Sequence, residues 1–158
     1  MKNHERVEKH YRSIIQNLRK RLQREQAQQT ARITLDPLPV SISVCKVEDY
    51  SGIDPDQPFC FTGRTDEEKS LVCPTELVPD NTINREDGWK AFRIRGELDF
   101  SLIGILARIS KILASNRIGI FAISTYNTDY ILTKADDYER ALAVLKSAGY
   151  IIRSGDEG

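Results

Sequence analysis

Apolar residues recur every three or four positions over the first thirty residues, while Lys and Arg occupy the other angles. This pattern is typical of an amphipathic helix and predicts one from Glu5 to about Gln28. The apolar positions are Val7, Tyr11, Ile14, Ile15, Leu18 and Leu22. The helical pattern is lost over residues 29–39, where Pro37 and Pro39 restrict the backbone, so we expect a junction there.

The middle of the chain predicts short strands separated by irregular connections. Apolar and polar residues alternate over 40–47, and shorter apolar runs at 59–62 and 70–73 are joined by a turn. Segments 49–58 and 74–88 are rich in Pro, Gly and Asn and therefore predict loops. Three successive carboxylates on one turn, residues 66–68, cannot all converge on a cation, so we interpret them as solvated charges.

The pattern is most regular from Trp89 onward. Phe92 and Ile94 alternate with Arg93 and Arg95, which predicts a half-buried strand. The elements predicted after it are a helix over 102–113 capped by Asp99 or Ser101, a strand over 118–124, a tight turn over 125–128, a strand over 129–133, a helix capped by Asp136 and closed by Gly149, and a strand over 150–152. The order strand, helix, strand, strand, helix, strand is the split βαβ arrangement.

This topology brings two loops together. With right-handed crossovers, the first two of these strands run parallel with the third between them, so loop 96–101 and turn 124–129 lie at one end of the sheet. The free N–H groups of the first helix can receive a carboxylate there, and Asp129 or Asp99 an ammonium or guanidinium group. A free amino acid presents both charges. The alternative interpretation is structural: Thr125, Asn127 and Asp129 only build the turn, and Asp99 only caps the helix.

The strand over 118–124 is apolar on both faces, whereas a sheet with helices on one side should alternate. Its second face is therefore expected to be covered. The candidates are the chain before Trp89, the N-terminal helix or a second subunit.

The net charge of zero averages over two unlike parts. Residues 1–35 carry nine Lys and Arg against three Glu, and residues 36–158 carry fourteen basic against twenty acidic groups. Basic amphipathic helices bind nucleic acid or anionic membranes. Here the helix has one aromatic residue, Tyr11, and no DNA-reading motif, so we favour a helix that lies on the body or pairs with its copy in a dimer.

The residues that usually carry catalysis are scarce. Both histidines, His4 and His10, lie in the basic segment, and the three cysteines, Cys45, Cys60 and Cys73, include no C-x-x-C pair. The chain has no glycine-rich phosphate-binding motif. We therefore expect no enzyme activity, no catalytic residue, no metal site and no cofactor. The chain lacks an apolar run of membrane-spanning length and a signal-peptide core, and its odd cysteine count suits a reducing compartment, so we expect a cytoplasmic protein.

Three stretches carry a resemblance to a known family. They are GELDFSLIGIL at 96–106, IGIFAISTYNTDYIL at 118–132 and, upstream, FCFTGRTDEEKSLVCP at 59–74. These stretches resemble the ACT domain, and in particular small tandem-ACT proteins related to the cytosolic arginine-sensor family and to aspartate kinase regulatory regions. The resemblance covers residues 38–152 and does not reach the N-terminal helix.

The resemblance implies an α+β, ferredoxin-like fold, with an abbreviated ACT-like half over 35–88 and an ACT domain (βαββαβ) over 89–153, which follow the basic helical arm over 1–34 that the residue pattern predicts. It implies a non-catalytic regulatory module that binds an amino acid at an interface between ACT units. The alternative is an oligomerisation or interaction protein that uses ACT pairing and the basic helix without a small ligand. The expected partners are a second copy or a regulated protein, and not nucleic acid.

Carried over by position, the implied ligand site lies between the loop after the first ACT strand and the turn after the second. Asp99, Ser101 and Gly104 would lie at the ligand carboxylate, and Thr125 and Asp129 near its amino or side-chain end. Ile120 and Asn127 belong to the same contacting segment, Ile120 to Asp129. In the arginine sensors an acidic residue at the Asp129 position faces the guanidinium, which admits a basic ligand. Two departures are that the loop has Asp99-Phe100-Ser101 where many ACT domains have Pro-Gly, and that no catalytic domain is fused.

Overall fold

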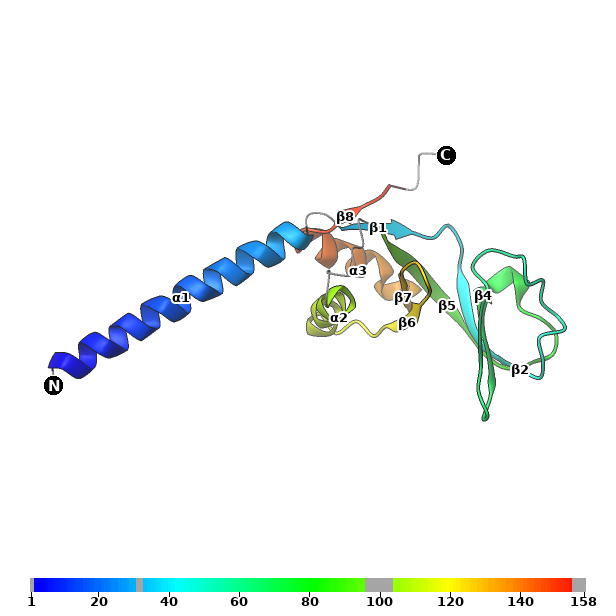
Figure 1. Ribbon diagram of the computed structural model, residues 1–158. Helices are drawn as coiled ribbons and strands as arrows, with labels where there is room; N and C mark the ends of the chain where they lie inside the picture. The colour runs from blue at the N-terminus through cyan, green and yellow to red at the C-terminus, as the bar shows by residue number, and fades with distance from the viewer. Residues whose placement is uncertain (1, 31–32, 96–103, 155–158) are drawn as a thin grey trace.

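The computed structural model describes residues 2–30, 33–95 and 104–154, and in these a long helix extends away from a body of strands and helices (Figure 1). The helix is α1 (Lys2–Thr30). The elements of the body are β1 (Thr34–Pro37), β2 (Ile42–Val47), β3 (Phe61–Arg64), β4 (Lys69–Pro74), the 3-10 turn η1 (Thr75–Leu77), β5 (Thr82–Arg95), α2 (Ile105–Ser115), β6 (Phe121–Ser124), β7 (Asp129–Lys134), α3 (Ala135–Ser147) and β8 (Ile151–Ile152).

Strand β5 joins two groups of strands. Its first half pairs with β2, which continues through β4 to β3, and its second half pairs with β7 on one side and β1 on the other. Trp89 stands where the two halves meet, because it lies opposite Ile42 of β2 and Lys134 of β7. One strand therefore fixes the position of both groups.

The second half of the chain has the predicted α+β, ferredoxin-like topology. Strand β7 is antiparallel to both β5 and β6, so β5 and β6 run parallel with β7 between them. Helices α2 and α3 cover one face of this sheet (Figure 1). Their buried side chains, such as Ile109 and Leu145, pack on Phe92 and Ile131 of the sheet. We call this the helix face.

The expected junction over 29–39 is wrong in its second part. Helix α1 continues to Thr30, and β1 is inserted in the sheet, antiparallel to β5 and parallel to β8. Ile33 and Leu35 are buried in the helix-face core, so the period of two over this short segment is that of a strand. Pro37 ends β1 beyond the two residues that pair with β8, where one side of the strand is an edge and proline is tolerated.

The expected irregular connection over 74–88 is wrong in part. Strand β5 begins at Thr82 and runs on without a break through the boundary expected between residues 88 and 89. The hydropathy pattern missed it because residues 84–88 are all exposed and nothing in their side chains alternates. Pairing of the backbone with β2 forms the strand instead.

The helix caps also differ from expectation. Asp136 does not cap α3, because the helix begins at Ala135 after Lys134, and no side chain caps it. Asp136 and Asp137 lie in the first turn instead, where carboxylates interact favourably with the helix dipole. Asp99 and Ser101 lie outside the described residues, and in the described part α2 follows Gly104, whose φ is 83°. The expected stop at Gly149, with φ 106°, is confirmed.

The second face of the sheet is covered, as the strand over 118–124 predicted. Leu38, Ile42 and Val72 from the first half of the body form a core with Ala91 and Leu132 of the sheet. Two edge-to-face ring contacts extend this core, Phe61 with Tyr130 at 5.0 Å and Trp89 with Phe121 at 6.1 Å between centroids. The chain before Trp89 is therefore what covers this face, which we call the second face.

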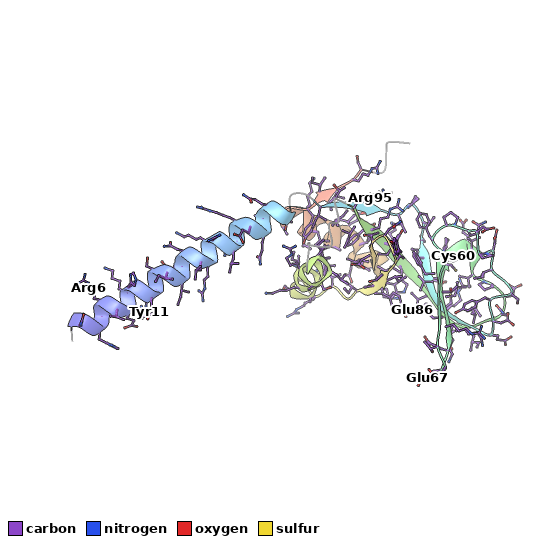
Figure 2. The ribbon with its side chains drawn as sticks, in the orientation of Figure 1. Arg6, Tyr11, Cys60, Glu67, Glu86 and Arg95 are labelled. Carbon is purple, nitrogen blue, oxygen red and sulfur yellow. The ribbon has the colours of Figure 1, made fainter. Side chains whose placement is uncertain are left out.

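Helix α1 does not lie on the body, so that part of the expectation is wrong. Its apolar residues from Val7 to Leu22 are exposed, and burial begins only at Thr30. Figure 2 shows Arg6 and Tyr11 projecting from the part of the helix far from the body. No helix in the described ranges is both long enough and apolar enough to cross a membrane.

A bulge at Gly88 lets β5 pass from one group of strands to the other. Between the pairs Ile42 with Trp89 and Val44 with Glu86, β5 contains one residue more than β2. Gly88 takes up the irregularity with a left-handed φ of 81°, and a Cβ at this position would meet no atom within 4 Å. A side chain here is therefore disfavoured by backbone strain and not by a clash.

We predict that Gly88→Ala lowers the free energy of unfolding by about 1–2 kcal/mol, the cost of a non-glycine residue in this region of φ. Gly88→Asn should cost less, because Asn tolerates the left-handed conformation better. The matched control is Gly119→Ala, where a Cβ also has open space but φ is not left-handed. Urea unfolding measures all three, and equal losses for Gly88→Ala and Gly119→Ala would show that the bulge carries no strain.

Candidate functional site

The turn after β6 and the end of β5 lie side by side. The Thr128 hydroxyl donates a hydrogen bond of 2.6 Å to the carbonyl oxygen of Ile94, the last residue but one of β5. The turn therefore lies at the end of the sheet where the described part of β5 stops, while the loop predicted over 96–101 lies outside the described residues and its position stays a prediction. Asp99 and Ser101 lie outside the described residues.

Thr125 closes the turn. Its backbone N–H and its hydroxyl both donate to the carbonyl oxygen of Thr128 at 2.9 Å, and the hydroxyl accepts from the Thr128 N–H at 3.4 Å. This network is what the structural interpretation of Thr125 requires. Tyr126 is completely exposed at the tip, and Asn127 beside it is also exposed. The turn thus presents one aromatic ring and one amide to solvent.

Asp129 lies on the helix face. Strand β7 alternates, so that Ile131 belongs to the helix-face core while Tyr130 and Leu132 belong to the second-face core, and Asp129 shares the side of Ile131. Its carboxylate is half-buried at the end of the strand, opposite Ser124. Within residues 2–30, 33–95 and 104–154 it forms no ion pair and accepts no hydrogen bond at its side chain.

Two other residues of the predicted site are on the same side of the sheet. Ile120 is half-buried against the helix-face core. Gly104 precedes the first turn of α2, and its carbonyl oxygen accepts the N–H of Arg108 at 2.9 Å. The helix face therefore holds a half-buried carboxylate, and α2, which covers this face, begins with N–H groups that lack helical partners.

A charge cluster on the second face was not predicted. Asp36 of β1 accepts hydrogen bonds from the Nε atoms of Arg93 at 3.0 Å and Arg95 at 2.7 Å, both on β5. The Asp36 side chain is only 15% exposed. Burial raises its pKa, but the hydrogen bonds and charges of the two guanidinium groups outweigh burial and hold the pKa below its ordinary value. The alternation of Arg93 and Arg95 was visible in the sequence, but their partner lies on a strand that was not recognised.

The three cysteines are free thiols within or beside the core of the first half of the body. Cys45 and Cys73 are buried, Cys60 is half-buried, and all three are free. Burial and the neighbouring thiols raise the pKa of Cys73 to about 12, so it stays protonated and unreactive at neutral pH. In the part of the chain that the structure describes, no group of three or more His, Cys, Asp or Glu is placed to hold a metal ion.

A sequence profile of the ACT domain matches residues 84–147. The crystal structure of protein Atu0741 from Agobacterium tumefaciens is similar to this chain, with 30% sequence identity and a TM-score of 0.67, over 77% of this chain and 92% of that protein. The chain belongs to the ACT-domain family. The matched range begins inside β5 and ends with α3, so it contains the turn and Asp129.

Other solved structures share the fold at lower identity. Protein VC0802 from Vibrio cholerae, described as of unknown function and a possible transport protein, has 18% identity and a TM-score of 0.63 over 79% of this chain and 96% of that one. The ligand-free regulatory subunit of aspartate kinase from Thermus thermophilus has 13% identity and a TM-score of 0.50 over 73% and 95%. No curated protein matches the chain. The ACT fold predicted from the sequence is confirmed.

We predict that Asp36→Asn lowers the free energy of unfolding at pH 7 by about 1–2 kcal/mol, because two neighbouring guanidinium groups lose their charged acceptor. A carboxylate whose pKa is lowered by folding contributes stability above its unfolded pKa, about 3.9, and this stability is lost as pH falls through the folded pKa. The difference between wild type and variant should therefore shrink below pH 4.

Urea unfolding at pH 7 and pH 3 measures this difference. Asp66→Asn, in the exposed turn between β3 and β4, is the matched control and should have little effect at pH 7. A difference for Asp36→Asn that is as large at pH 3 as at pH 7 would contradict the role assigned to its charge.

Proposed function

We propose that this protein is a non-catalytic regulatory module that binds a free amino acid at the end of the sheet where β5, α2 and the turn over 125–128 meet. The observation that carries the proposal is the position of Asp129, a carboxylate without a partner among the described residues, at the helix-face end that Thr128 ties to β5. The fold shared with the regulatory subunit of the Thermus thermophilus aspartate kinase supports a regulatory role.

In the proposed complex, the two ends of the amino acid meet opposite charges. The N–H groups at the start of α2, after Gly104, receive the carboxylate, since helix N-termini attract anions. Asp129 receives the amino group or a basic side chain. Thr125 and Asn127 border the ligand, while Ile120 lies on the same face but at the other end of β6. We extend the proposal to Asp99 and Ser101, which precede α2 in the sequence.

The chemistry of the described residues supports a binding role more than catalysis. Both histidines lie on the exposed helix α1, and burial raises the pKa of each of the three thiols. We propose neither a catalytic residue nor a cofactor. We also propose a reducing, cytoplasmic location, which the free buried thiols favour, and treat residues 35–88 as an abbreviated ACT-like half beside the ACT domain over 89–153.

A second function is favoured by a different observation. The Thr125 hydroxyl is already engaged in the turn, and α1 exposes its apolar residues to solvent. Both facts suit a protein that assembles with a second copy, or with a regulated partner, and binds no small ligand. The two functions differ in whether any amino acid stabilises the protein.

We predict that one amino acid, or a small group of related ones, raises the melting temperature in a screen of the twenty. Ligand at a hundred times its Kd should add about 2.7 kcal/mol of stability. Asp129→Asn should abolish this effect for a basic ligand and leave the melting temperature of the free protein unchanged. Asp136→Asn, on the exposed first turn of α3, is the matched control and should bind like wild type.

The possible results of this screen test the binding function and the position of the ligand separately. If no amino acid shifts the melting temperature, the sensor function fails and assembly becomes the better account. If an amino acid binds and Asp129→Asn binds it equally well, the function stands and the proposed position of the ligand is wrong.

A further inference from the structure

The exposed apolar residues of α1 form one continuous stripe. Val7, Tyr11, Ile14, Ile15, Leu18 and Leu22 are 41–61% exposed. At 100° per residue these six positions fall within about 100° of the helix circumference and extend about 22 Å along its axis. A stripe of this width is the face that an amphipathic helix packs against another element, and such packing supplies most of the stability of a helix in a protein. The body does not cover this face of α1, so a second helix is what the surface lacks.

The spacing of the stripe is symmetrical about its own midpoint. Reversing the chain direction about the point between Ile14 and Ile15 exchanges these two residues. The same operation exchanges Tyr11 with Leu18 and Val7 with Leu22. Every apolar position therefore faces another apolar position when two copies of α1 pack antiparallel about this point. We propose that α1 pairs with α1 of a second copy in this antiparallel register.

The charges beside the stripe favour this direction. In the antiparallel pair, residues on the same flank of the stripe face each other, and Glu8 of one copy lies within about 3 Å of Arg19 of the other along the axis. The contact occurs twice by symmetry. In a parallel pair, opposite flanks of the stripe face each other, and Arg19 of one copy lies beside Arg21 of the other. This repulsive contact also occurs twice by symmetry. Attraction in one direction and repulsion in the other selects the antiparallel dimer.

The bodies give the same preference. Residues 36–158 carry a net charge of −6, and in a parallel dimer two such bodies would lie together at one end of the helices. In the antiparallel dimer the two Thr30 residues are about 45 Å apart along the axis. The basic N-terminal end of each helix then lies beside the end of its partner that leads into the acidic body. This surface is independent of the amino-acid site on the ACT domain.

The dimer is tested first by sedimentation of the full chain over a range of concentrations. Wild type should pass from monomer to dimer, and its helical signal should fall on dilution as α1 loses its partner. Ile14→Asp with Ile15→Asp should raise the dimer Kd at least tenfold. The matched control, Gln16→Asp with Asn17→Asp, changes neighbouring positions outside the stripe and should dimerise like wild type. Thermal unfolding of each variant should show an unchanged body, because the substitutions are far from its core.

Helix direction has two further readouts. Arg19→Glu should weaken an antiparallel dimer by removing its contact with Glu8 and should strengthen a parallel one by removing the contact with Arg21. Combining Arg19→Glu with Glu8→Arg should restore dimerisation. Spin labels on Asn3→Cys should be about 35 Å apart in the antiparallel dimer and within about 15 Å in a parallel one. Unmutated protein carried through the same labelling gives the background from its native thiols.

Four results would overturn the proposal. They are a monomer at every concentration, a dimer that the Ile14→Asp, Ile15→Asp variant leaves intact, a short distance between the labels at residue 3, and strengthening by Arg19→Glu. Vesicles of phosphatidylserine and phosphatidylcholine provide the competing test. Binding of monomeric protein to these vesicles, with loss of binding in the same double variant, would assign the stripe to a membrane surface instead.

Discussion

The hydrogen-bond ladder of β5 is the constraint on which the rest of the structure depends. A strand has two edges, and β5 uses both over its second half, toward β7 and toward β1, after it has paired with β2 over its first half. The segments before and after Trp89 are therefore tied to one backbone. The apolar side chains on the second face, from Ile42 to Leu132, then pack because the ladder has already set their separation.

Where the side-chain pattern coincides with burial, the sequence alone was sufficient to predict the helix or strand. The apolar positions of α2 and β7 are buried because their periods of 3.6 and 2 match the faces that the fold covers. The first half of β5 and all of β1 were missed for physical reasons. The first half of β5 is exposed and is formed by backbone pairing alone. Strand β1 is four residues long and ends in proline. That the turn lies beside the end of β5 follows from chain topology, which needs no individual contact to be predicted. By contrast, Asp36 precedes Arg93 by 57 positions and Arg95 by 59 positions in the sequence, and no local pattern indicates pairs so far apart.

The two faces of the ACT sheet differ in charge at the end where β5 finishes. Arg93 and Arg95 stand on the second face with a single carboxylate between them, while Asp129 stands on the helix face without a described partner. Alternation along neighbouring strands produces this separation, because adjacent residues point to opposite sides. Under the proposed function, the sheet would therefore separate an amino acid bound on the helix face, beside Asp129, from the guanidinium groups on the second face.

The positions of the rare side chains divide the molecule into regions that can be observed separately. All three thiols lie in the half before Trp89, in the core beneath the loop that contains Tyr50 and Ile53, whereas the ACT domain after it has none. The single tryptophan lies at the boundary, in contact with Phe121 and with the Lys134 ammonium 4.3 Å from its ring. Alkylation of the cysteines therefore records opening of the first half alone, while indole fluorescence records separation of the two halves. The native chain thus carries its own probes for whether the halves unfold together or in succession.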